Sequence, residues 1–367
     1  MTILPKGAKK LTDYGNLAYL FMRLLREGWK VAIISGNSAR VQLEKIYYPI
    51  LSEMGGENPA LKNLVFYVNG GSTKITFTEK GEVVYDEKYN QKPEHRLDKE
   101  IFVKTIKKVL KNPSEKNFGL TEEETQKFID EIQEKYPKKN YPGLELTFPW
   151  REGADWEPME ILPGEIESLK SKGSEIKKIA CPWIEIRNEK EDEKVGKVAA
   201  IAIKPTPKFE IPIEGKKVKE VDIRPKIQRG IQNEIEKIQE EEKIDFHFFI
   251  GSGGETTTDI SVGKVAAIND LIKDKKKIKR EYVFYFGDEF YEYKVEVGGG
   301  EQVTITGNDL EIARKVDGIT CVAVNYNKRA DNFEGADTPI IRLGRSPQAI
   351  LEFLEAVLAL KDESLPA

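Results

Sequence analysis

The chain has 367 residues, 39% of them hydrophobic and 33% charged, with a formal net charge of −4. This length favours two domains, and the acidic balance provides no global basic field for binding nucleic acid. The two cysteines, Cys181 and Cys321, make neither a disulfide framework nor a zinc pattern, so each is expected to be a buried thiol in a reducing compartment. The two histidines, His95 and His247, lie far apart in the sequence and argue against a histidine-based triad or metal cluster.

No apolar run reaches membrane-spanning length, and the first residues contain no apolar signal-peptide core. We therefore expect a cytoplasmic protein with neither a membrane nor a nucleic acid as partner. The sequence specifies no oligomeric state.

Apolar periodicity and turn residues predict alternating helices and strands along the whole chain. The predicted helices span 12–27, 39–54, 98–111, 121–134, 163–172, 226–242, 264–272, 310–316 and 349–360. The predicted strands span 30–34, 64–68, 73–78, 82–86, 144–148, 183–187, 197–204, 246–250, 282–286, 319–325 and 340–343. Between about residues 92 and 250 the charge density rises, which indicates an inserted second domain of α+β type.

The first strand is a nearly continuous apolar run, which is typical of parallel strands buried on both faces. It leads into Ser35-Gly36-Asn37-Ser38 and then into a helix. A strand, a small polar loop and a helix form the geometry of a phosphate-binding turn, in which the Ser35 hydroxyl and the amides of Gly36 and Asn37 face an anion. The alternative is an ordinary turn in which Ser38 caps the helix.

Lys264 opens a predicted helix directly after Gly263. The pair does not belong to a P-loop, because Thr258 stands where that motif requires a glycine. A lysine in a first helical turn is electrostatically unfavourable unless an anion is near. An ordinary surface lysine is the alternative explanation.

The stretch from Tyr282 to Ala313 places two acids after predicted turns. Gly287 and Asp288 follow an aromatic, β-prone run, and Asp309 precedes a helical pattern. Ligands of open α/β sheets bind at the carboxyl ends of strands, and carboxylates suit Mg²⁺. The alternative is that the first acid belongs to a turn and that Asn308-Asp309 form a helix N-cap.

In this order, the Ser35 turn, the large insertion, Lys264 and Asp288 with Asp309 resemble the haloacid dehalogenase (HAD) superfamily of phosphotransferases. The resemblance covers nearly the whole chain and is greatest to sugar-phosphate phosphatases and eukaryotic-type phosphomannomutases with a large α/β cap. It implies an α/β fold with a Rossmann-like core, in which a mostly parallel sheet lies between helices. Residues 1–91 and 251–367 would form this core, and residues 92–250 the inserted α+β cap.

The resemblance also implies roles for individual residues. Ser35 would hydrogen-bond the transferring phosphoryl group, and Lys264 would stabilise its charge. Asp288 would bind Mg²⁺, and Asp309 would complete or support that metal site. Arg187 ends a cap segment that resembles the strand before the substrate loop of phosphomannomutase, so it would grip the substrate.

One motif of the family is absent. Its first motif, an apolar strand followed by D-x-D-G-T, supplies the nucleophile and the general acid/base, and it occurs nowhere in this sequence. Thr2-Ile3-Leu4 resembles the residues that follow it, so we expect the chain to begin just after the catalytic strand. The neighbouring strands would then have an unpaired edge, and hydrolysis by this polypeptide should be negligible.

The sequence therefore predicts a Mg²⁺-dependent phosphomonoester hydrolase that acts on a small phosphorylated metabolite, with a sugar phosphate as the expected substrate. The reaction would pass through an aspartyl-phosphate whose aspartate is missing from the sequence. A non-catalytic protein that binds a phosphorylated ligand is the main alternative, and a phosphosugar mutase is a further one.

Overall fold

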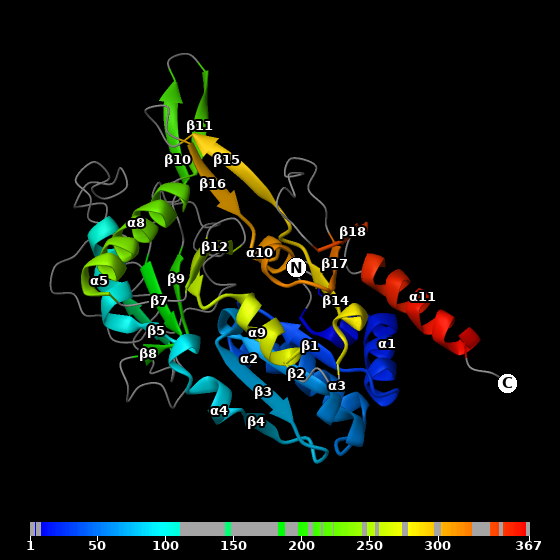
Figure 1. Cartoon of the computed structure of the whole chain (residues 1–367). Helices are drawn as coiled ribbons and strands as arrows, with labels where there is room; N and C mark the ends of the chain where they lie inside the picture. Colours follow the sequence, from blue (N-terminus) through cyan, green and yellow to red (C-terminus); the bar gives the residue numbers. More distant parts are fainter. Residues whose placement is uncertain are drawn as a thin grey trace. The chain divides into compact units, whose positions relative to one another are not determined.

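The structure is a computed structural model of the chain (Figure 1). It describes residues 4, 9–110, 144–147, 183–187, 197–204, 208–213, 216–222, 224–243, 248–253, 257–273, 278–296, 302–324, 338–344 and 348–364. The chain divides into two compact units, and we describe each by itself. Unit 1 comprises Met1–His95, Gly263–Tyr293 and Thr306–Ala367, and unit 2 comprises Arg96–Val262 and Lys294–Ile305.

The first sheet of unit 1 has the strand order β1-β2-β3-β4. β1 (Val31–Ile34) pairs in parallel with β2 (Leu64–Val68), and the antiparallel hairpin of β3 (Thr73–Phe77) and β4 (Val83–Tyr85) extends it. Every residue of β2 is buried, as expected for a continuous apolar run between two layers of helices.

The second sheet of unit 1 has the order β14-β17-β18 and is entirely parallel. Its strands are β14 (Phe284–Gly287), β17 (Thr320–Ala323) and β18 (Ile340–Arg342). Parallel strands connected through helices confirm the predicted α/β class.

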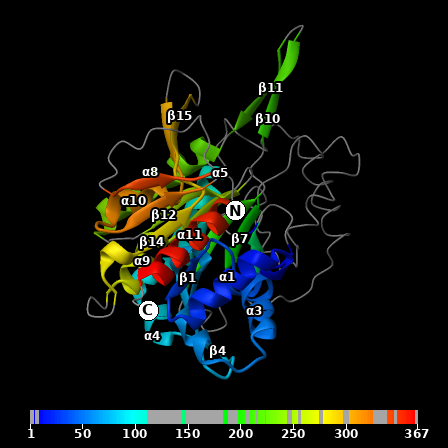
Figure 2. The same ribbon diagram turned by 90° about the vertical axis from the view of Figure 1, so that its right-hand side faces the viewer.

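Two helices from opposite ends of the sequence pack side by side in unit 1. They are α1 (Gly15–Arg26) and α11 (Gln348–Ser364), and both views show them as neighbours (Figures 1 and 2). Leu20 and Leu24 of α1 share a small apolar cluster with Leu358 of α11. The closing helix of the sequence therefore completes the core that the first helix begins.

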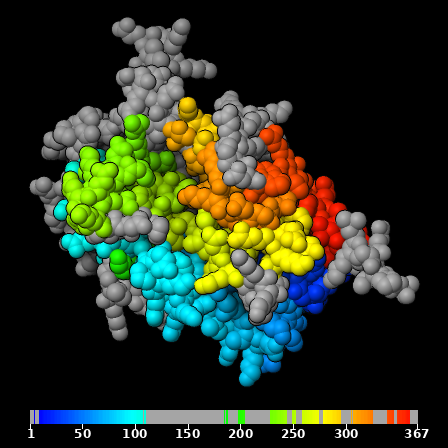
Figure 3. Space-filling model, viewed as in Figure 1, coloured from blue at the N-terminus to red at the C-terminus, as the bar shows by residue number. Residues whose placement is uncertain are grey.

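Helix α9 (Lys264–Leu271) contacts residues of both sheets in unit 1. Its Ala267 packs with Val65 and Tyr67 of β2, whereas its Ile268 packs in a cluster with Tyr285 of β14. In the space-filling view the yellow residues that include α9 lie between the blue N-terminal residues and the orange residues that include α10 (Leu310–Lys315) (Figure 3).

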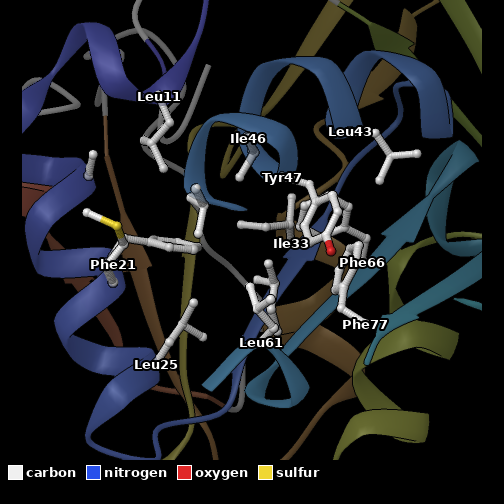
Figure 4. Close-up of a cluster of buried hydrophobic side chains, with 14 of the residues drawn as sticks. Leu11, Phe21, Leu25, Ile33, Leu43, Ile46, Tyr47, Leu61, Phe66 and Phe77 are labelled. Atoms are coloured by element: carbon white, nitrogen blue, oxygen red, sulfur yellow. The ribbon is translucent and has the colours of Figure 1, made fainter. Parts of the chain in front are cut away.

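The largest apolar cluster of unit 1 forms between α1, the first sheet and the segment after β1 (Figure 4). Tyr47 stacks on Phe77 with ring centroids 3.9 Å apart, and Phe66 meets the edge of Phe77 at 5.0 Å. Phe66 and Tyr47 are completely buried, so these rings fix how the segment after β1 lies on the sheet.

A polar cluster fastens the far end of α9 to the same sheet. Asp270 of α9 accepts hydrogen bonds from the Tyr67 hydroxyl at 2.8 Å and from Lys74 Nζ at 2.9 Å. Lys74 also pairs with Asp86 at 3.1 Å. Burial alone would raise the pKa of Asp270, but the hydrogen bonds from Lys74 and Tyr67 outweigh it and lower that pKa. The charged pair is therefore the stable form in the folded chain.

Unit 2 is built on a five-stranded antiparallel sheet of order β12-β13-β9-β7-β6. The strands are β6 (Leu144–Thr147), β7 (Trp183–Arg187), β9 (Ala200–Lys204), β12 (Phe249–Gly253) and β13 (Thr257–Ser261). Ile184, Ile186, Ile201 and Ile203 of this sheet share a core with residues of α5 (Lys99–Leu110) and α8 (Arg224–Glu242).

Three two-stranded ladders complete the described strands. They are β5 (Leu97–Asp98) with β8 (Lys197–Val198), β10 (Lys208–Ile213) with β11 (Lys216–Asp222), and β15 (Glu292–Glu296) with β16 (Gln302–Thr306). Within the described residues, every helix falls short of the length and apolar character that a membrane-spanning helix needs.

The structure corrects several predicted elements. The helix predicted over 39–54 is interrupted: α2 (Ala39–Gln42) and α3 (Tyr48–Glu53) flank a π-helical segment, Leu43–Tyr47. The strand predicted over 246–250 is instead β12, because antiparallel pairing with β13 includes Gly251 and Gly253. β10, β11, β13, β15 and β16 were not predicted. The helices predicted over 121–134 and 163–172 lie outside the described residues.

The Asp270 cluster predicts a pH-dependent contribution to stability. A carboxylate whose pKa is lowered by folding stabilises the folded state above its unfolded pKa of about 3.9, and this stabilisation disappears as the pH falls. We expect Asp270→Asn to lower the free energy of unfolding by about 1–3 kcal/mol at pH 7, because Lys74 loses one of its two charged partners and Tyr67 loses a charged acceptor. Urea unfolding of the full chain should show this difference shrinking below about pH 4.

The exposed pair Lys62–Glu79 provides the matched control. Both side chains are more than half exposed, so Glu79→Gln should change the free energy by about 0.5 kcal/mol or less at either pH. Equal effects of the two substitutions, or a pH-independent effect of Asp270→Asn, would contradict the assignment.

Candidate active site

The turns that follow β1 and β2 are hydrogen-bonded to each other. The Asn69 amide donates to the Asn37 carbonyl and the Gly70 amide donates to the Ser35 carbonyl, both at 2.9 Å. Asn69 and Gly70 adopt positive φ angles of 52° and 69°, which bend the chain tightly enough for these bonds. The predicted polar loop at Ser35 is therefore held firmly at the carboxyl end of the sheet.

Ser35 is oriented by two donors. Its hydroxyl oxygen accepts hydrogen bonds from the Asn37 amide at 3.1 Å and from Gln42 Nε2 at 2.9 Å. A hydroxyl has two acceptor positions and one proton, so the Ser35 proton is left to donate to another group. The Asn37 amide, which was expected to face an anion, is directed at Ser35 instead. Ser38 stands at the N-cap position of α2, but it makes no side-chain capping bond.

Gln42 is a site residue that the sequence did not reveal. It is only 7% exposed and is the last residue before the π-helical segment. Isolated π turns within α-helices are frequent at functional sites. In the sequence, the only signal for a role of Gln42 was that a polar residue occupies an apolar position of the helix predicted over 39–54.

A close approach of two glycines places the start of α9 beside these turns. Gly71 has a φ of +95°, and a Cβ atom added to it would lie 2.6 Å from the carbonyl oxygen of Gly263. Only a residue without a side chain fits there, so Gly71 permits Gly263 and Lys264 to lie against the turn after β2.

Lys264 and Asp309 form an ion pair inside unit 1. Lys264 Nζ lies 2.6 Å from Asp309 Oδ1, and the two side chains are 15% and 1% exposed. Asp309 also accepts the Tyr285 hydroxyl at 2.6 Å and the Glu289 amide at 2.8 Å. Lys264 is therefore not an ordinary surface lysine. Asp309 does stand at the N-cap position of α10, as the alternative expected, but its carboxylate makes no capping bond.

The electrostatics of the pair keep both Lys264 and Asp309 charged. Burial would raise the pKa of Asp309, but the charge and hydrogen bonds of Lys264 lower it. Burial would lower the pKa of Lys264, but the charge of Asp309 raises it. Burial, followed by the charge of Asp309, raises the pKa of Tyr285 well above its ordinary value, so this phenol stays a donor.

Two glycines permit close packing at the end of β14, Gly287 against the Asp309 side chain and Gly307 against the backbone of Glu289. A Cβ atom on Gly287 would lie 2.5 Å from the Asp309 carboxyl carbon. A Cβ atom on Gly307 would overlap the carbonyl oxygen of Glu289. The glycines before each acid are thus needed by packing as well as by the turns.

Glu289 is a third acid at this site, and the sequence did not point to it. It follows Asp288 directly and accepts a hydrogen bond from Asn308 Nδ2 at 2.7 Å. Burial, together with the charges of Asp309 and Asp288, raises its pKa to about 7 against the opposing effect of Lys264. The carboxyl end of β14 therefore holds three neighbouring acids around one ammonium group.

The described residues supply only part of a metal shell. Carboxylate oxygens such as those of Asp288 are the ligands that Mg²⁺ prefers. However, no group of three or more His, Cys, Asp or Glu residues in the described part of the chain is placed to hold a metal. Both oxygens of Asp309 already accept protein donors. Of the two predicted metal ligands, Asp309 is therefore already engaged by protein donors, and Asp288 stays a prediction.

Arg187 belongs to unit 2 and stays a prediction as a substrate-binding residue. Its Nη2 lies 3.5 Å from Asp259 Oδ1 across the sheet, and its side chain is 11% exposed. The other predicted site residues, Ser35, Gly36, Asn37, Lys264, Asp288 and Asp309, all belong to unit 1.

No known protein family matches this chain in sequence, and no curated protein matches it significantly. Solved structures resemble it distantly. The N-terminally truncated IMP-nucleotidase of Plasmodium falciparum shares 14% identity at a TM-score of 0.45, over 96% of this chain and 69% of that one. The IMP-bound form of that protein shares 14% identity at a TM-score of 0.45, over 98% of this chain and 66% of that one. A protein of Streptococcus mutans shares 12% identity at a TM-score of 0.43, over 97% of this chain and 95% of that one. At that distance, function has to be argued from this chain's own residues.

The packing at Gly287 generates a steric prediction. We expect Gly287→Ala to destabilise the folded chain by about 1–3 kcal/mol, because its methyl group would displace the Asp309 carboxylate. Thermal unfolding with and without the substitution measures this. Gly344→Ala is the control, since nothing lies within 4 Å of a Cβ atom there. If both variants unfold like the parent chain, Asp309 does not lie against β14.

The hydrogen bond from Gln42 to Ser35 can be isolated with a double-mutant cycle. Gln42→Leu keeps a buried side chain of similar size and should weaken the binding of inorganic phosphate roughly fivefold to tenfold, as expected for one net hydrogen bond. Ser35→Ala should weaken it at least as much. If Gln42 acts through Ser35, it should have no further effect in the Ser35→Ala background, and calorimetric titration of all four chains measures this. Additive effects would contradict the proposed coupling.

Proposed function

We propose that the Ser35–Lys264 site binds the phosphoryl group of a small phosphorylated metabolite. The proposal is carried by two groups: the mostly buried ammonium group of Lys264, and the Ser35 hydroxyl, whose acceptor positions are already occupied. The turn after β2 contacts the segment of each, because the Gly70 amide bonds the Ser35 carbonyl and Gly71 lies against Gly263. Both groups offer protons to an acceptor that brings negative charge. A phosphoryl group presents several such oxygens within the reach of one site.

The reaction we infer is Mg²⁺-dependent hydrolysis of a phosphomonoester, by a protein of HAD type, with a sugar phosphate as substrate. Phosphoryl transfer requires positioning and compensation of spread negative charge more than covalent chemistry. Lys264 would compensate charge, and Ser35 would donate one hydrogen bond. Asp288 would hold Mg²⁺, which would supply further positive charge at the phosphoryl oxygens.

Asp309 would act through Lys264. It keeps the ammonium group charged and fixed, and Tyr285 and the Glu289 amide keep Asp309 itself in place. Because both carboxylate oxygens of Asp309 already accept hydrogen bonds, Asp309 is poorly suited to be a nucleophile. The chain also carries no D-x-D-G-T sequence to supply one, so we expect binding without appreciable turnover. A non-catalytic protein that binds a phosphorylated ligand is the second candidate, and it is favoured by the same observation.

Thermal unfolding in the presence of ligand tests the proposal. Glucose 6-phosphate with Mg²⁺ should stabilise the chain, by roughly 2.7 kcal/mol at a concentration about 100-fold above Kd, whereas glucose should not. Ser35→Ala should reduce the stabilisation. Asp288→Asn should remove the part that depends on Mg²⁺. IMP belongs in the same screen as a second phosphomonoester, with inosine as its control.

Release of inorganic phosphate from glucose 6-phosphate, measured in the same samples, separates the two candidates. Binding without release is expected of the chain as it stands. Ordinary turnover would contradict the role that we give to the missing motif. The absence of stabilisation by any phosphomonoester, with or without Mg²⁺, would contradict the binding site itself.

A further inference from the structure

Tyr89 is a buried side chain that links separate parts of unit 1. It belongs to α4 (Glu87–Asn90), is only 2% exposed, and donates its amide to Asp86 at 3.0 Å. Its hydroxyl donates to the carbonyl oxygen of Gly71 at 2.7 Å, in a buried hydrogen bond. Removing the donor of such a bond is costly, because the buried carbonyl is left without a replacement from water.

The Gly71 carbonyl belongs to the turn that locates Lys264. Gly71 has a φ of +95°, and a Cβ atom there would lie 3.5 Å from the Cα atom of Lys264. The residue before it, Gly70, donates its amide to the Ser35 carbonyl at 2.9 Å. Glycines are free to adopt many backbone conformations, so a turn made of them is fixed by the bonds it makes. The Tyr89 hydroxyl therefore holds a peptide that contacts the segments of both groups of the proposed site.

The ring of Tyr89 packs against α9 as well. It shares an apolar cluster with Ala267 of α9 and Tyr67 of β2, and the two tyrosine rings meet edge to face at 5.5 Å. Ala267 lies in the first turn of the helix that Lys264 begins. One side chain thus holds the turn after β2 through its hydroxyl and the start of α9 through its ring.

His95 holds both the ring and the backbone of Tyr89. The two ring centroids lie 3.9 Å apart with the planes inclined at 37°, and His95 Nδ1 lies 2.9 Å from the Tyr89 carbonyl oxygen. A carbonyl oxygen only accepts hydrogen bonds, so Nδ1 carries the proton of the neutral imidazole. Protonation would add a second proton, at Nε2, and a positive charge to a ring that is only 6% exposed.

Burial is the largest influence on the His95 imidazole, and it lowers the pKa of this ring. The hydrogen bond to the Tyr89 carbonyl and the charges of Glu94 and Asp270 oppose that effect, whereas the charge of Lys92 adds to it. The net direction is downward, so the folded arrangement favours the neutral ring. The stability that this provides is present above the unfolded pKa of about 6.5 and is lost as the pH falls below it.

Two lysines already lie near the ring of Tyr89. The Nζ atoms of Lys74 and Lys92 are each 5.7 Å from the centroid of this ring. An aromatic face attracts a cation, but like charges gathered around one ring repel one another. A protonated His95 would be the third cation at this ring, so its stacking on Tyr89 is weaker than that of the neutral imidazole.

We propose that Tyr89 is a positioning residue for Lys264, and that His95 is a pH-sensitive switch that releases Tyr89 when protonated and so weakens phosphoryl binding. The inference rests on the proposed function of the Ser35–Lys264 site. With neutral His95, the stack holds Tyr89, and Tyr89 holds Gly71 against the start of α9. With charged His95, the imidazole moves toward water, the Gly71 carbonyl loses its donor, and the ammonium group is no longer fixed in advance. A charge that must first be repositioned compensates an anion less well.

Calorimetric titration of the full chain with sulfate, at about pH 7.5 and at about pH 5, tests the switch. Sulfate is a tetrahedral dianion at both pH values, so its own charge does not change. His95→Gln keeps a side chain that can donate to the Tyr89 carbonyl but takes up no proton. On going to the lower pH, the parent chain should lose roughly fivefold more affinity than His95→Gln, as expected for one net hydrogen bond. Other groups that titrate near the anion, such as Glu289, contribute equally in both chains.

Tyr89→Phe and Tyr47→Phe form a matched pair of variants. Each removes one hydroxyl from a buried, stacked ring, but the Tyr47 hydroxyl has no hydrogen-bond partner among the residues that the structure describes. Tyr89→Phe should bind sulfate roughly fivefold more weakly than the parent chain at the higher pH, and it should show a smaller pH effect. Tyr47→Phe should match the parent chain at both pH values.

Amide hydrogen exchange without any ligand separates this proposal from the proposed function. The Gly70 amide bonds the Ser35 carbonyl, so its protection, corrected for the intrinsic exchange rate at each pH, reports whether the turn is closed. Its protection should fall about fivefold or more at the lower pH in the parent chain and not in His95→Gln. The Gly56 amide, which bonds the Leu51 carbonyl, is the control and should be unaffected. If no anion binds but Gly70 responds in this way, the proposed function has failed and the coupling stands.

Three results would overturn the proposal. The first is an equal pH effect on sulfate binding in the parent chain and in His95→Gln. The second is that Tyr89→Phe binds sulfate as tightly as Tyr47→Phe. The third is that the Gly70 amide of the parent chain is equally protected at both pH values.

Discussion

The buried ion pair between Lys264 and Asp309 is the interaction on which the site of unit 1 depends. Removing two charges from water is costly, and such a pair often contributes little net stability. Here the cost is offset because Asp309 accepts donors from Tyr285 and Glu289 as well as from Lys264. The arrangement fixes the position of an ammonium group rather than maximising stability. A charge held in advance needs no reorganisation when a negative ligand arrives, which is the condition for effective electrostatic stabilisation.

Helix α9 transmits this position to the rest of unit 1. Its first residue is Lys264, its middle packs on both sheets, and Asp270 near its end is fastened to Tyr67 and Lys74. The close approach of Gly71 to Gly263 sets its starting point. A helix fixed at both ends cannot slide along the sheet without breaking buried hydrogen bonds. The stability of the sheet and the placement of the ammonium group are therefore coupled through one eight-residue helix.

The parts of this structure that the sequence predicts are those that local patterns determine. The runs that became β1, β2 and β14 were predicted because buried parallel strands are continuously apolar, and Ser35 and Asp288 follow from their ends. The partners of Asp309 could not be predicted, since Tyr285 looks like any aromatic strand residue and pairing depends on tertiary contacts. Strand β13 was missed because its sequence, Thr-Thr-Asp-Ile-Ser, shows no alternation of apolar and polar residues. Threonine nevertheless favours strands, and β13 pairs with β9. The strand predicted over 246–250 did not include Gly251 and Gly253 because glycine disfavours strands, although both pair with β13.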